Sequence, residues 1–237
     1  MQERRIALVG AMPMEVEPYL TRIGDARREE CGPFVFHLGT ACGVPVAVLC
    51  CGIGKVNAAM AVQALIDRFA PGLVLHSGVG GSLTAGLGLL DALIARDCVQ
   101  YDVDTTALGD PPGMISTIDR VSLPCDAAVA DGLMAAAREA GASAKFGRVA
   151  TGDRFLSSAE EKRGIAEAFG ALTCDQESAA IAQVCFVHNV PCGVVRAVSD
   201  ATDGAHGDEF KVYAPRAAEI AAGIVWRFLE KFGNNLQ

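Results

Sequence analysis

Residues 5–23 read RIALVGAMPMEVEPYLTRI, and this stretch sets the pattern for the rest of the chain. Arg5–Val9 has the apolar run of a buried strand, and that run is too short for a secretory apolar segment. After Gly10, Pro13 occupies the first turn of a helix expected over Met14–Ile23, where its missing N–H costs nothing. A strand that leads through a turn into a helix is the building unit of α/β folds.

Strands and helices are expected to alternate along the remainder of the chain. Further strands are expected at 34–38, 44–50, 73–77, 145–151 and 192–198, with one or two more between 89 and 99. Helices are expected at 55–69, 125–140, 158–169, 177–188 and 208–232. The sequence contains no internal repeat or linker that would divide it, so we expect one α/β domain over residues 1–237.

The composition favours a single buried core and disfavours several classes of partner. Of the 237 residues, 51% are hydrophobic and only 6% are aromatic, which suits close packing of helices on a sheet. Twenty Lys and Arg against 28 Asp and Glu give a net charge of -8, which disfavours nucleic acid and anionic lipid as partners. Apolar stretches stay far below the roughly 18 residues of a membrane helix.

Nine cysteines raise the question of disulfides or a metal site. Their number is odd, no CxxC spacing occurs, and Cys98, Cys185 and Cys192 lie inside apolar runs. Free cysteine behaves as a small buried hydrophobe in a reducing compartment. We therefore expect reduced, mostly buried thiols in a cytoplasmic protein, with no metal site.

Polar residues gather where the expected strands end, which is the edge at which open α/β sheets bind ligands. The segments are 10–15 (GAMPME), 78–81 (GVGG), 151–155 (TGDRF), 174–177 (CDQE) and 196–200 (RAVSD). A polar loop at 102–119, rich in Asp, Thr, Gly and Pro, has the character of a functional loop that covers a site.

Taken singly, each of these signals has a plainer explanation. Glu15, Glu177 and Asp200 are also explained as acids that cap or begin a helix, and Phe155 as a core side chain. The segment GVGGS at 78–82 lacks the full GxGxxG spacing of a dinucleotide-binding turn. His76 has no second His or Cys at ligand spacing, so we interpret it as a core histidine. Only the combination of these segments distinguishes a functional site from these plainer explanations.

That combination resembles the nucleoside phosphorylase and nucleosidase superfamily, and within it the 5'-methylthioadenosine/S-adenosylhomocysteine nucleosidases. The resemblance extends from Ile6 to about Phe210. The matching motifs, in order, are 9–15 (VGAMPME), 52–59 (GIGKVNAA), 151–155 (TGDRF), 177–182 (ESAAIA) and 196–200 (RAVSD). It implies a mixed central sheet flanked by helices, a homodimer, and a small nucleoside substrate handled without metal or organic cofactor.

The resemblance also implies which side chains carry the chemistry. Asp200 would be the general acid at adenine N7, oriented by Ser199, because adenine leaves poorly as an anion and needs a proton as the bond breaks. Glu15 would activate the attacking water. An ionised carboxylate at that place also stabilises the cation-like ribose that forms during cleavage.

Other side chains would bind the substrate. By the same resemblance Glu177 would hold the two ribose hydroxyls through charge-assisted hydrogen bonds. Met12 would pack near the sugar, and Phe155 would stack on the base. Further substrate-binding positions are Ile53, Val79 and Gln176.

Two alternatives stay open. A purine nucleoside phosphorylase of the same fold would need arginines that hold phosphate just after the first strand and beside the glycine segment. Here these regions read MPME at 12–15 and HSG at 76–78, and neither offers a guanidinium. A catalytically silent nucleoside-binding member is the second alternative, and the presence of all three acids argues against it.

The sequence departs from the family pattern near the base and the 5' group. Residues 175–177 read DQE, where the family usually has Glu-Met-Glu. Val79 stands where a small hydroxyl residue is common. Gly207 falls near the place where an aromatic residue closes the 5' pocket, so this pocket is expected to lack a side chain there.

The polar loop adds to this expectation. Thr105, Leu108 and Asp110 occupy positions that usually supply apolar and aromatic contacts to an alkylthio group. We therefore expect an enzyme of broader range, which also accepts adenosine, 5'-deoxyadenosine or a charged homocysteine chain whose ammonium lies near Asp110. Alternatively, Met12, Ile53 and a residue of a partner subunit restore the apolar wall.

Overall fold

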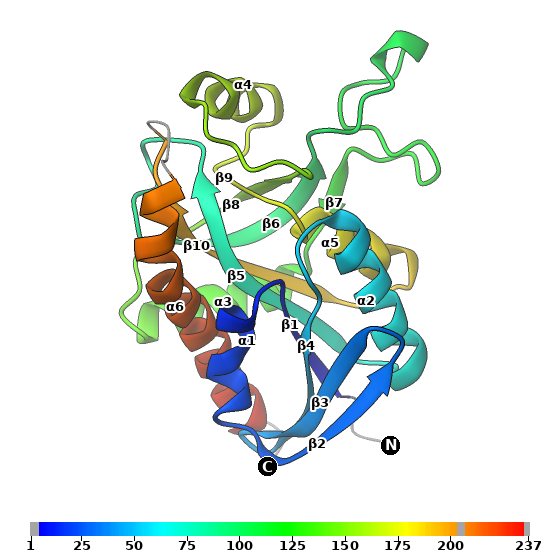
Figure 1. The fold of residues 1–237 in the computed structure, drawn as a ribbon, viewed down its shortest axis with the longest axis vertical. Helices are drawn as coiled ribbons and strands as arrows, with labels where there is room; N and C mark the ends of the chain where they lie inside the picture. Colours follow the sequence, from blue (N-terminus) through cyan, green and yellow to red (C-terminus); the bar gives the residue numbers. More distant parts are fainter. Residues whose placement is uncertain (1–4, 203–206, 235–237) are drawn as a thin grey trace.

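A mixed β-sheet runs through the centre of the molecule, and helices cover both of its faces (Figure 1). The computed structural model describes residues 5–202 and 207–234. The strands are β1 (Ile6–Gly10), β2 (Gly24–Cys31), β3 (Phe34–Ala41), β4 (Val44–Cys50), β5 (Leu73–Ser82), β6 (Ala92–Gln100), β7 (Ser122–Pro124), β8 (Ala144–Thr151), β9 (Thr173–Asp175) and β10 (Cys192–Asp200). The helices are α1 (Pro13–Leu20), α2 (Lys55–Phe69), the 3-10 helix η1 (Thr106–Leu108), α3 (Ala127–Glu139), α4 (Ala159–Phe169), α5 (Ser178–Val187) and α6 (Gly207–Asn234).

Part of the sheet closes into a ring of strands. β5 pairs in parallel with β10, and the ring continues through β6, β8 and β9 back to β5. β1 and β4 extend from β5 as parallel neighbours, and β3 and β2 follow as an antiparallel pair at the edge. Because β1, β5 and β10 are parallel, their carboxyl ends meet at one edge of the sheet. This edge holds the segments 10–15, 78–82 and 196–200.

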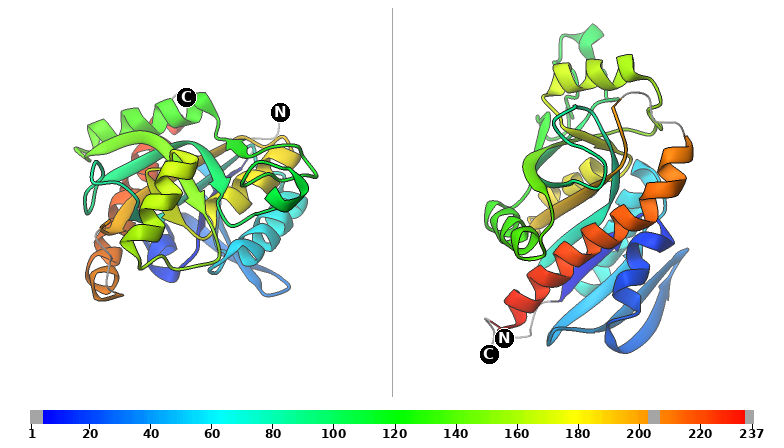
Figure 2. Two further views of the ribbon diagram at one scale, coloured as in Figure 1. Left: turned by 90° about the horizontal axis from the view of Figure 1, so that it is seen from above. Right: turned by 90° about the vertical axis from the view of Figure 1, so that its left-hand side faces the viewer.

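Two layers of helices bury the two faces of the sheet. α1, α3 and α6 cover one face, and α2 and α5 cover the other (Figure 2). α6 turns small side chains toward the sheet, among them Ala214, Ala218 and Ala221, and so lies close to it. Within residues 5–202 and 207–234, no helix is both long and apolar enough to cross a bilayer.

The predicted α/β class and mixed sheet are confirmed, and the predicted helix at 55–69 matches α2 residue for residue. Pro13 is the first residue of α1, as expected from its missing N–H. The strand β2 was not predicted, because its sequence GDARREEC is charged and mostly exposed. It forms at the edge by pairing with β3, where charged side chains discourage pairing with another chain.

The strand expected at 73–77 is longer than predicted, because the glycine segment 78–81 is not a turn that ends it. β5 continues through these glycines to Ser82, paired with β10 and then β9. A side chain here would collide with the polar groups packed against the strand. A Cβ at Gly80 would lie 2.8 Å from Thr173 Oγ1, and one at Gly81 would lie 2.7 Å from Asp200 Oδ2. The glycines therefore let acids and hydroxyls approach the strand backbone.

Candidate active site

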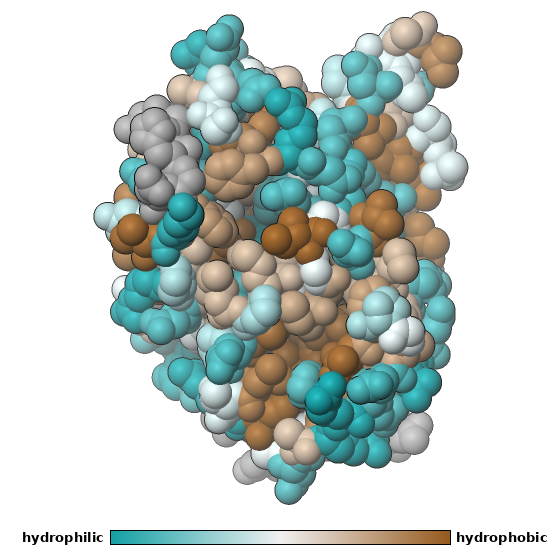
Figure 3. Space-filling view, in the orientation of Figure 1, coloured by the Kyte–Doolittle hydropathy of each residue, from teal (hydrophilic) through white to brown (hydrophobic). Residues whose placement is uncertain are grey.

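A cavity of about 380 Å³ opens where β1, β5, β9 and β10 end, below α4. Apolar side chains gather on this face of the molecule below α4 (Figure 3). Nine predicted catalytic or substrate-binding residues line the cavity, namely Met12, Glu15, Ile53, Val79, Phe155, Gln176, Glu177, Ser199 and Asp200. The lining also includes residues without a predicted role, which are Ala11, Gly80, Gly81, Arg154, Leu156, Cys174, Asp175 and Phe210.

Glu15 is a buried carboxylate held by backbone N–H groups. It lies in the first turn of α1, and Oε2 accepts hydrogen bonds from Ala11 N at 2.6 Å and Met12 N at 2.9 Å. Oε1 accepts from Val79 N at 2.9 Å, on the neighbouring strand β5. A carboxylate has about four lone-pair sites, so these three bonds leave roughly one for a further donor. The side chain is thus fixed in place with a single free acceptor site.

Glu177 precedes α5 and keeps more of its acceptor capacity. Oε1 accepts from Gly54 N at 2.9 Å, and Oε2 lies 3.6 Å from Arg196 Nη2. Gly54 has φ +98, a conformation that suits glycine, and this directs its N–H at the carboxylate. Burial raises the pKa of Glu177 to about 7, and repulsion from Asp175 adds to the rise. Its remaining lone pairs are available to a ligand with two neighbouring hydroxyls.

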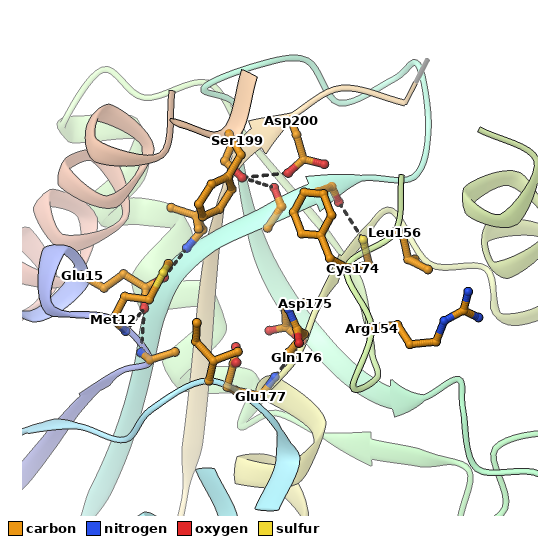
Figure 4. A pocket seen from close by; sticks show the side chains of 17 residues that line it. Met12, Glu15, Arg154, Leu156, Cys174, Asp175, Gln176, Glu177, Ser199 and Asp200 are labelled. Carbon is orange, nitrogen blue, oxygen red and sulfur yellow. Dashed lines mark hydrogen bonds between the residues drawn. The ribbon is translucent and has the colours of Figure 1, made fainter. Parts of the chain in front are cut away.

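Asp200 ends β10, and both of its oxygens accept hydrogen bonds. Ser199 Oγ donates to Oδ1 at 2.9 Å, and Lys162 Nζ donates to Oδ2 at 2.9 Å. Both members of this ion pair are buried. Glu15, Glu177 and Asp200 approach the cavity from different sides, as Figure 4 shows. No sequence signal distinguished Lys162, which lies in the charged stretch AEEKR of α4.

Arg196 places a buried guanidinium among the acids. Its side chain is 1% exposed, and Nη2 lies 2.6 Å from Asp175 Oδ2. Nη1 lies 3.9 Å from Glu15 Oε1 and donates to Val79 O at 3.3 Å. Nε donates to Ser178 Oγ at 3.1 Å. Arg196 lies within the motif at 196–200 but had no predicted role.

His76, Asp175 and Glu177 have potential metal-binding atoms within 4.8 Å of one another. Arg196 already supplies the cation at this place, since Nη2 contacts His76 Nε2 as well as the two acids. His76 Nδ1 lies 2.9 Å from Val9 O, so Nδ1 carries the proton and Nε2 accepts from Arg196. Burial and the Arg196 charge lower the pKa of His76 to about 3, which keeps the ring neutral. The side chain is a buried, hydrogen-bonded histidine, as the sequence indicated.

Asp175, the shortened acid of the DQE segment, binds Arg196 among the other acids of the site. It accepts from Thr151 Oγ1 at 2.5 Å and from the hydroxyl of Ser178. Burial opposes ionisation, but the Arg196 charge and these hydrogen bonds lower the pKa of Asp175 below its ordinary value. Asp175 is therefore the permanent negative partner of Arg196.

Aromatic and apolar side chains form another part of the cavity wall. Phe155 is 49% exposed and meets Phe210 edge to face, with ring centroids 6.0 Å apart. The expectation that Gly207 leaves the 5' pocket without a side chain at that place stays a prediction. Gly207 begins α6, and Phe210, one turn further along the helix, supplies a ring to the cavity. The interpretation of Phe155 as a plain core residue is wrong, because the residue is 49% exposed and lines the cavity.

The polar loop 102–119 does not close the cavity within one chain. It carries η1 and extends outward from the body of the molecule (Figure 1). Thr105, Leu108 and Asp110 are absent from the cavity lining. Leu108 is 83% exposed, and Thr105 Oγ1 donates to Asp110 Oδ2 at 2.7 Å. Their expected contact with a 5' group is thus not made by the same chain.

Comparison with known proteins places this geometry among nucleoside-cleaving enzymes. Residues 5–230 match the sequence profile of the Phosphorylase superfamily. The chain is 34% identical over 229 residues to the 5'-methylthioadenosine/S-adenosylhomocysteine nucleosidase of Haemophilus ducreyi, covering 96% of this chain and 98% of the relative. It is 30% identical over 227 residues to the aminodeoxyfutalosine nucleosidase of Campylobacter jejuni, with coverage of 96% and 99%. The solved 5'-methylthioadenosine/S-adenosylhomocysteine nucleosidase of Neisseria meningitidis, in complex with methylthio-immucillin-A, superposes with a TM-score of 0.92 at 31% identity, covering 96% and 99%.

The raised pKa of Glu177 makes stability depend on pH in a defined direction. The folded chain holds this proton to about pH 7, whereas the unfolded chain releases it near the ordinary Glu value. Wild-type stability should therefore fall as the pH rises through that window. The free energy of unfolding of Glu177→Gln, relative to that of wild type, should therefore be higher at about pH 8 than at about pH 5, by on the order of 2 kcal/mol. Urea unfolding at both pH values measures the change, with the exposed Glu17→Gln as control. If the stability difference between Glu177→Gln and wild type is the same at both pH values, the raised pKa of Glu177 is contradicted.

Proposed function

This chain belongs to the Phosphorylase superfamily, and from that premise we propose that it hydrolyses the N-glycosidic bond of 5'-methylthioadenosine, S-adenosylhomocysteine or a related adenine nucleoside. Two relatives that match almost its whole length are a 5'-methylthioadenosine/S-adenosylhomocysteine nucleosidase and an aminodeoxyfutalosine nucleosidase. One observation carries the proposal. Glu15, Glu177 and Asp200 line a single cavity, and each has a different set of partners.

Asp200 is assigned to the leaving group. As the bond between the sugar and adenine breaks, the electron pair moves onto the base, and a proton at N7 makes adenine a far better leaving group. Asp200 lies at the end of β10 with Ser199 Oγ fixing one of its oxygens. A carboxyl group held in this way contributes orientation as well as the proton, because it cannot rotate away from the base.

Glu15 is assigned two roles, which are to stabilise the cation-like ribose and to activate the attacking water. The ribose ring becomes cation-like as the base departs, and a fixed carboxylate stabilises such a charge without reorganisation. Three backbone N–H groups hold Glu15, and its one remaining acceptor site fits a single water molecule. The water is thereby oriented for attack and gives up its proton to the same carboxylate.

Glu177 is assigned to the ribose hydroxyls. Only one backbone N–H bonds to it, so its oxygens retain room for two hydroxyl donors. The 2'- and 3'-hydroxyls of ribose form such a pair, and charge-assisted bonds to both fix the ring. Met12 and Ile53 line the same cavity and supply apolar contact to the sugar, while Phe155 presents a ring on which adenine stacks.

Water is the acceptor in this proposal because phosphate lacks a cationic partner. Within the described residues, the guanidinium buried nearest Glu15 belongs to Arg196, and its donors are committed to Asp175, Ser178 and Val79. Glu15 itself would repel a phosphate dianion. Both features favour hydrolysis over phosphorolysis.

The apolar wall bears on the 5' group. Phe210, Phe155 and Leu156 line the cavity together with Met12 and Ile53. Each buried methylene-sized contact contributes about 0.8 kcal/mol, so a wall of this kind favours an alkylthio group over a hydroxyl. Phe210 thus restores part of the selectivity that Gly207 was expected to remove.

We further propose that the protein acts as a homodimer in the cytoplasm. The cavity rim is open at Ile53, and α2 continues this exposed apolar surface with Val56 and Met60. Leu108 exposes apolar area at the tip of the outward loop, where a second copy can cover it. The nine cysteines are free thiols, which fits a reducing compartment. Sedimentation should give a mass near twice 24.6 kDa, and a monomer at micromolar concentration would contradict this proposal.

An assay for free adenine tests the reaction directly. We expect adenine and free pentose from 5'-methylthioadenosine at the same rate with and without inorganic phosphate. Among the described residues, each arginine at the cavity is already paired with an acid, Arg196 with Asp175 and Arg154 with Glu161. The same assay with adenosine should give a lower kcat/KM, since the apolar wall loses its contact. A sugar 1-phosphate as the main product would refute hydrolysis. If no adenine nucleoside gives any product, the protein is better explained as a catalytically silent, nucleoside-binding member of the family.

Replacing the acid tests the assignment of Asp200. Asp200→Asn should lower kcat by roughly 100-fold or more, the range expected for loss of general acid catalysis. The amide leaves Lys162 without its counter-charge, so thermal unfolding must show that the variant is folded at the assay temperature. The control Asp126→Asn keeps the N-cap of α3 and should retain full activity. Near-normal turnover of Asp200→Asn would remove Asp200 from this role.

A further inference from the structure

Lys162 is the only fully buried residue of α4 among those the structure describes, and it is 1% exposed. Its Nζ donates to Asp200 Oδ2 at 2.9 Å and to Ala201 O at 2.6 Å. A buried ion pair adds little stability over well-packed apolar side chains, because removing both charges from water is costly. Met or Leu would anchor α4 beside Ile165 and Phe169 at least as well. Stability therefore does not account for an ammonium at this position.

The hydrogen bonds of Asp200 show where the acidic proton lies before reaction. Ser199 Oγ donates to Oδ1, and Lys162 Nζ donates to Oδ2. Both oxygens of Asp200 are thus engaged by donors, and the Lys162 ammonium contacts one of them directly. The nearest transferable proton is on Lys162, which lies outside the cavity lining. A lysine ammonium, unlike a guanidinium, can release a proton in a protein.

We propose that Lys162 holds the proton that Asp200 passes to the departing adenine, so that the pair acts as one acid. The inference rests on the proposed function and deepens it. Lys162 does not touch the substrate, and it acts through Asp200 as a positioning residue that also supplies the proton. The arrangement lets Asp200 remain a well-oriented carboxylate in the free enzyme and still serve as an acid at neutral and alkaline pH.

The protons and electrons balance over one turnover. As the C1'–N9 bond breaks, its electron pair passes to adenine, N7 takes a proton from Asp200, and Asp200 takes one from Lys162. The attacking water gives hydroxide to C1' and its proton to Glu15. When adenine leaves, Glu15 releases its proton to solvent and Lys162 takes one back. The enzyme returns to its starting state with no proton gained or lost.

Other charged and titratable groups near the pair do not replace this function. In the described part of the chain, Cys174 of β9 faces Asp200, with Asp175 behind it. Burial and the Asp200 charge raise the pKa of Cys174 to about 12, so it stays a thiol. From α6, Glu209 Oε2 accepts from Ala201 N at 3.3 Å, and on α4 itself Glu161 pairs with Arg154. Tyr101, from the end of β6, is also held as a neutral phenol, because burial raises its pKa.

The pH dependence of kcat in Lys162→Met tests the proposal. Without the ammonium, the proton for adenine must come from solvent through Asp200, and solvent supplies hydronium less readily as the pH rises. Relative to wild type at the same pH, we expect a loss below about 3-fold near pH 5 and a loss of at least about 30-fold near pH 8. Arg163→Met removes a charge from the exposed side of α4 and should leave the whole profile unchanged.

The alternatives give different profiles. A loss by the same factor at every pH would assign Lys162 a purely structural role and overturn the proposal, as would a profile that superposes on the wild type. If Lys162→Met does not fold, Lys162→Gln serves instead, because its amide still donates to Asp200 but has no proton to transfer. The same pH-dependent loss is expected. Absence of adenine from the wild-type enzyme would refute the proposed function itself, whatever the variants do.

Discussion

The buried guanidinium of Arg196 is the charge around which the rest of the site is arranged. Glu15, Asp175 and Glu177 lie within reach of its two terminal nitrogens, and three carboxylates cannot share one buried volume without a cation. Arg196 owes its position to β10, which lies between β5 and β6 in the ring. The strand pairing that builds the fold thus also fixes the distance between the acid assigned to water and the acid assigned to ribose.

Much of the fold follows from local patterns in the sequence. Apolar runs ended by glycine or polar residues predict β1, β4, β8 and β10, and the apolar stripe of residues 55–69 predicts α2. What local patterns cannot give is structure that forms only through pairing. β2 has a charged, exposed sequence, and β9 has three residues, so neither carries a periodic signal. The closure of the ring through β9 and the extension of β5 over its glycines depend on these partners.

The candidate site, like the fold, could be predicted from the sequence only in part. The acids at strand ends could be found from the sequence because strand ends converge at one edge of a parallel sheet, and the family motifs then supplied roles. Lys162 and Arg196 could not be singled out, because burial decides their meaning and the sequence around each is ordinary: AEEKR resembles a solvated helix surface, and Arg196 sits in an apolar strand. Phe210 was not predicted. The residue at which α6 begins, Gly207, decides which side chains of its first turns face the cavity, and the sequence did not predict that residue.

The three acids differ chiefly in what already bonds to them, and this difference is the strongest argument for hydrolysis. Glu15 has three backbone donors and one free site, Glu177 has one donor and room for two hydroxyls, and Asp200 faces an ammonium. Separate environments are how one site runs acid and base chemistry at one pH. A phosphorylase would need the Glu15 region to attract an anion, which requires a cation with free donors. Arg196 directs its donors at Asp175, Ser178 and Val79, so this cluster of side chains favours a neutral nucleophile.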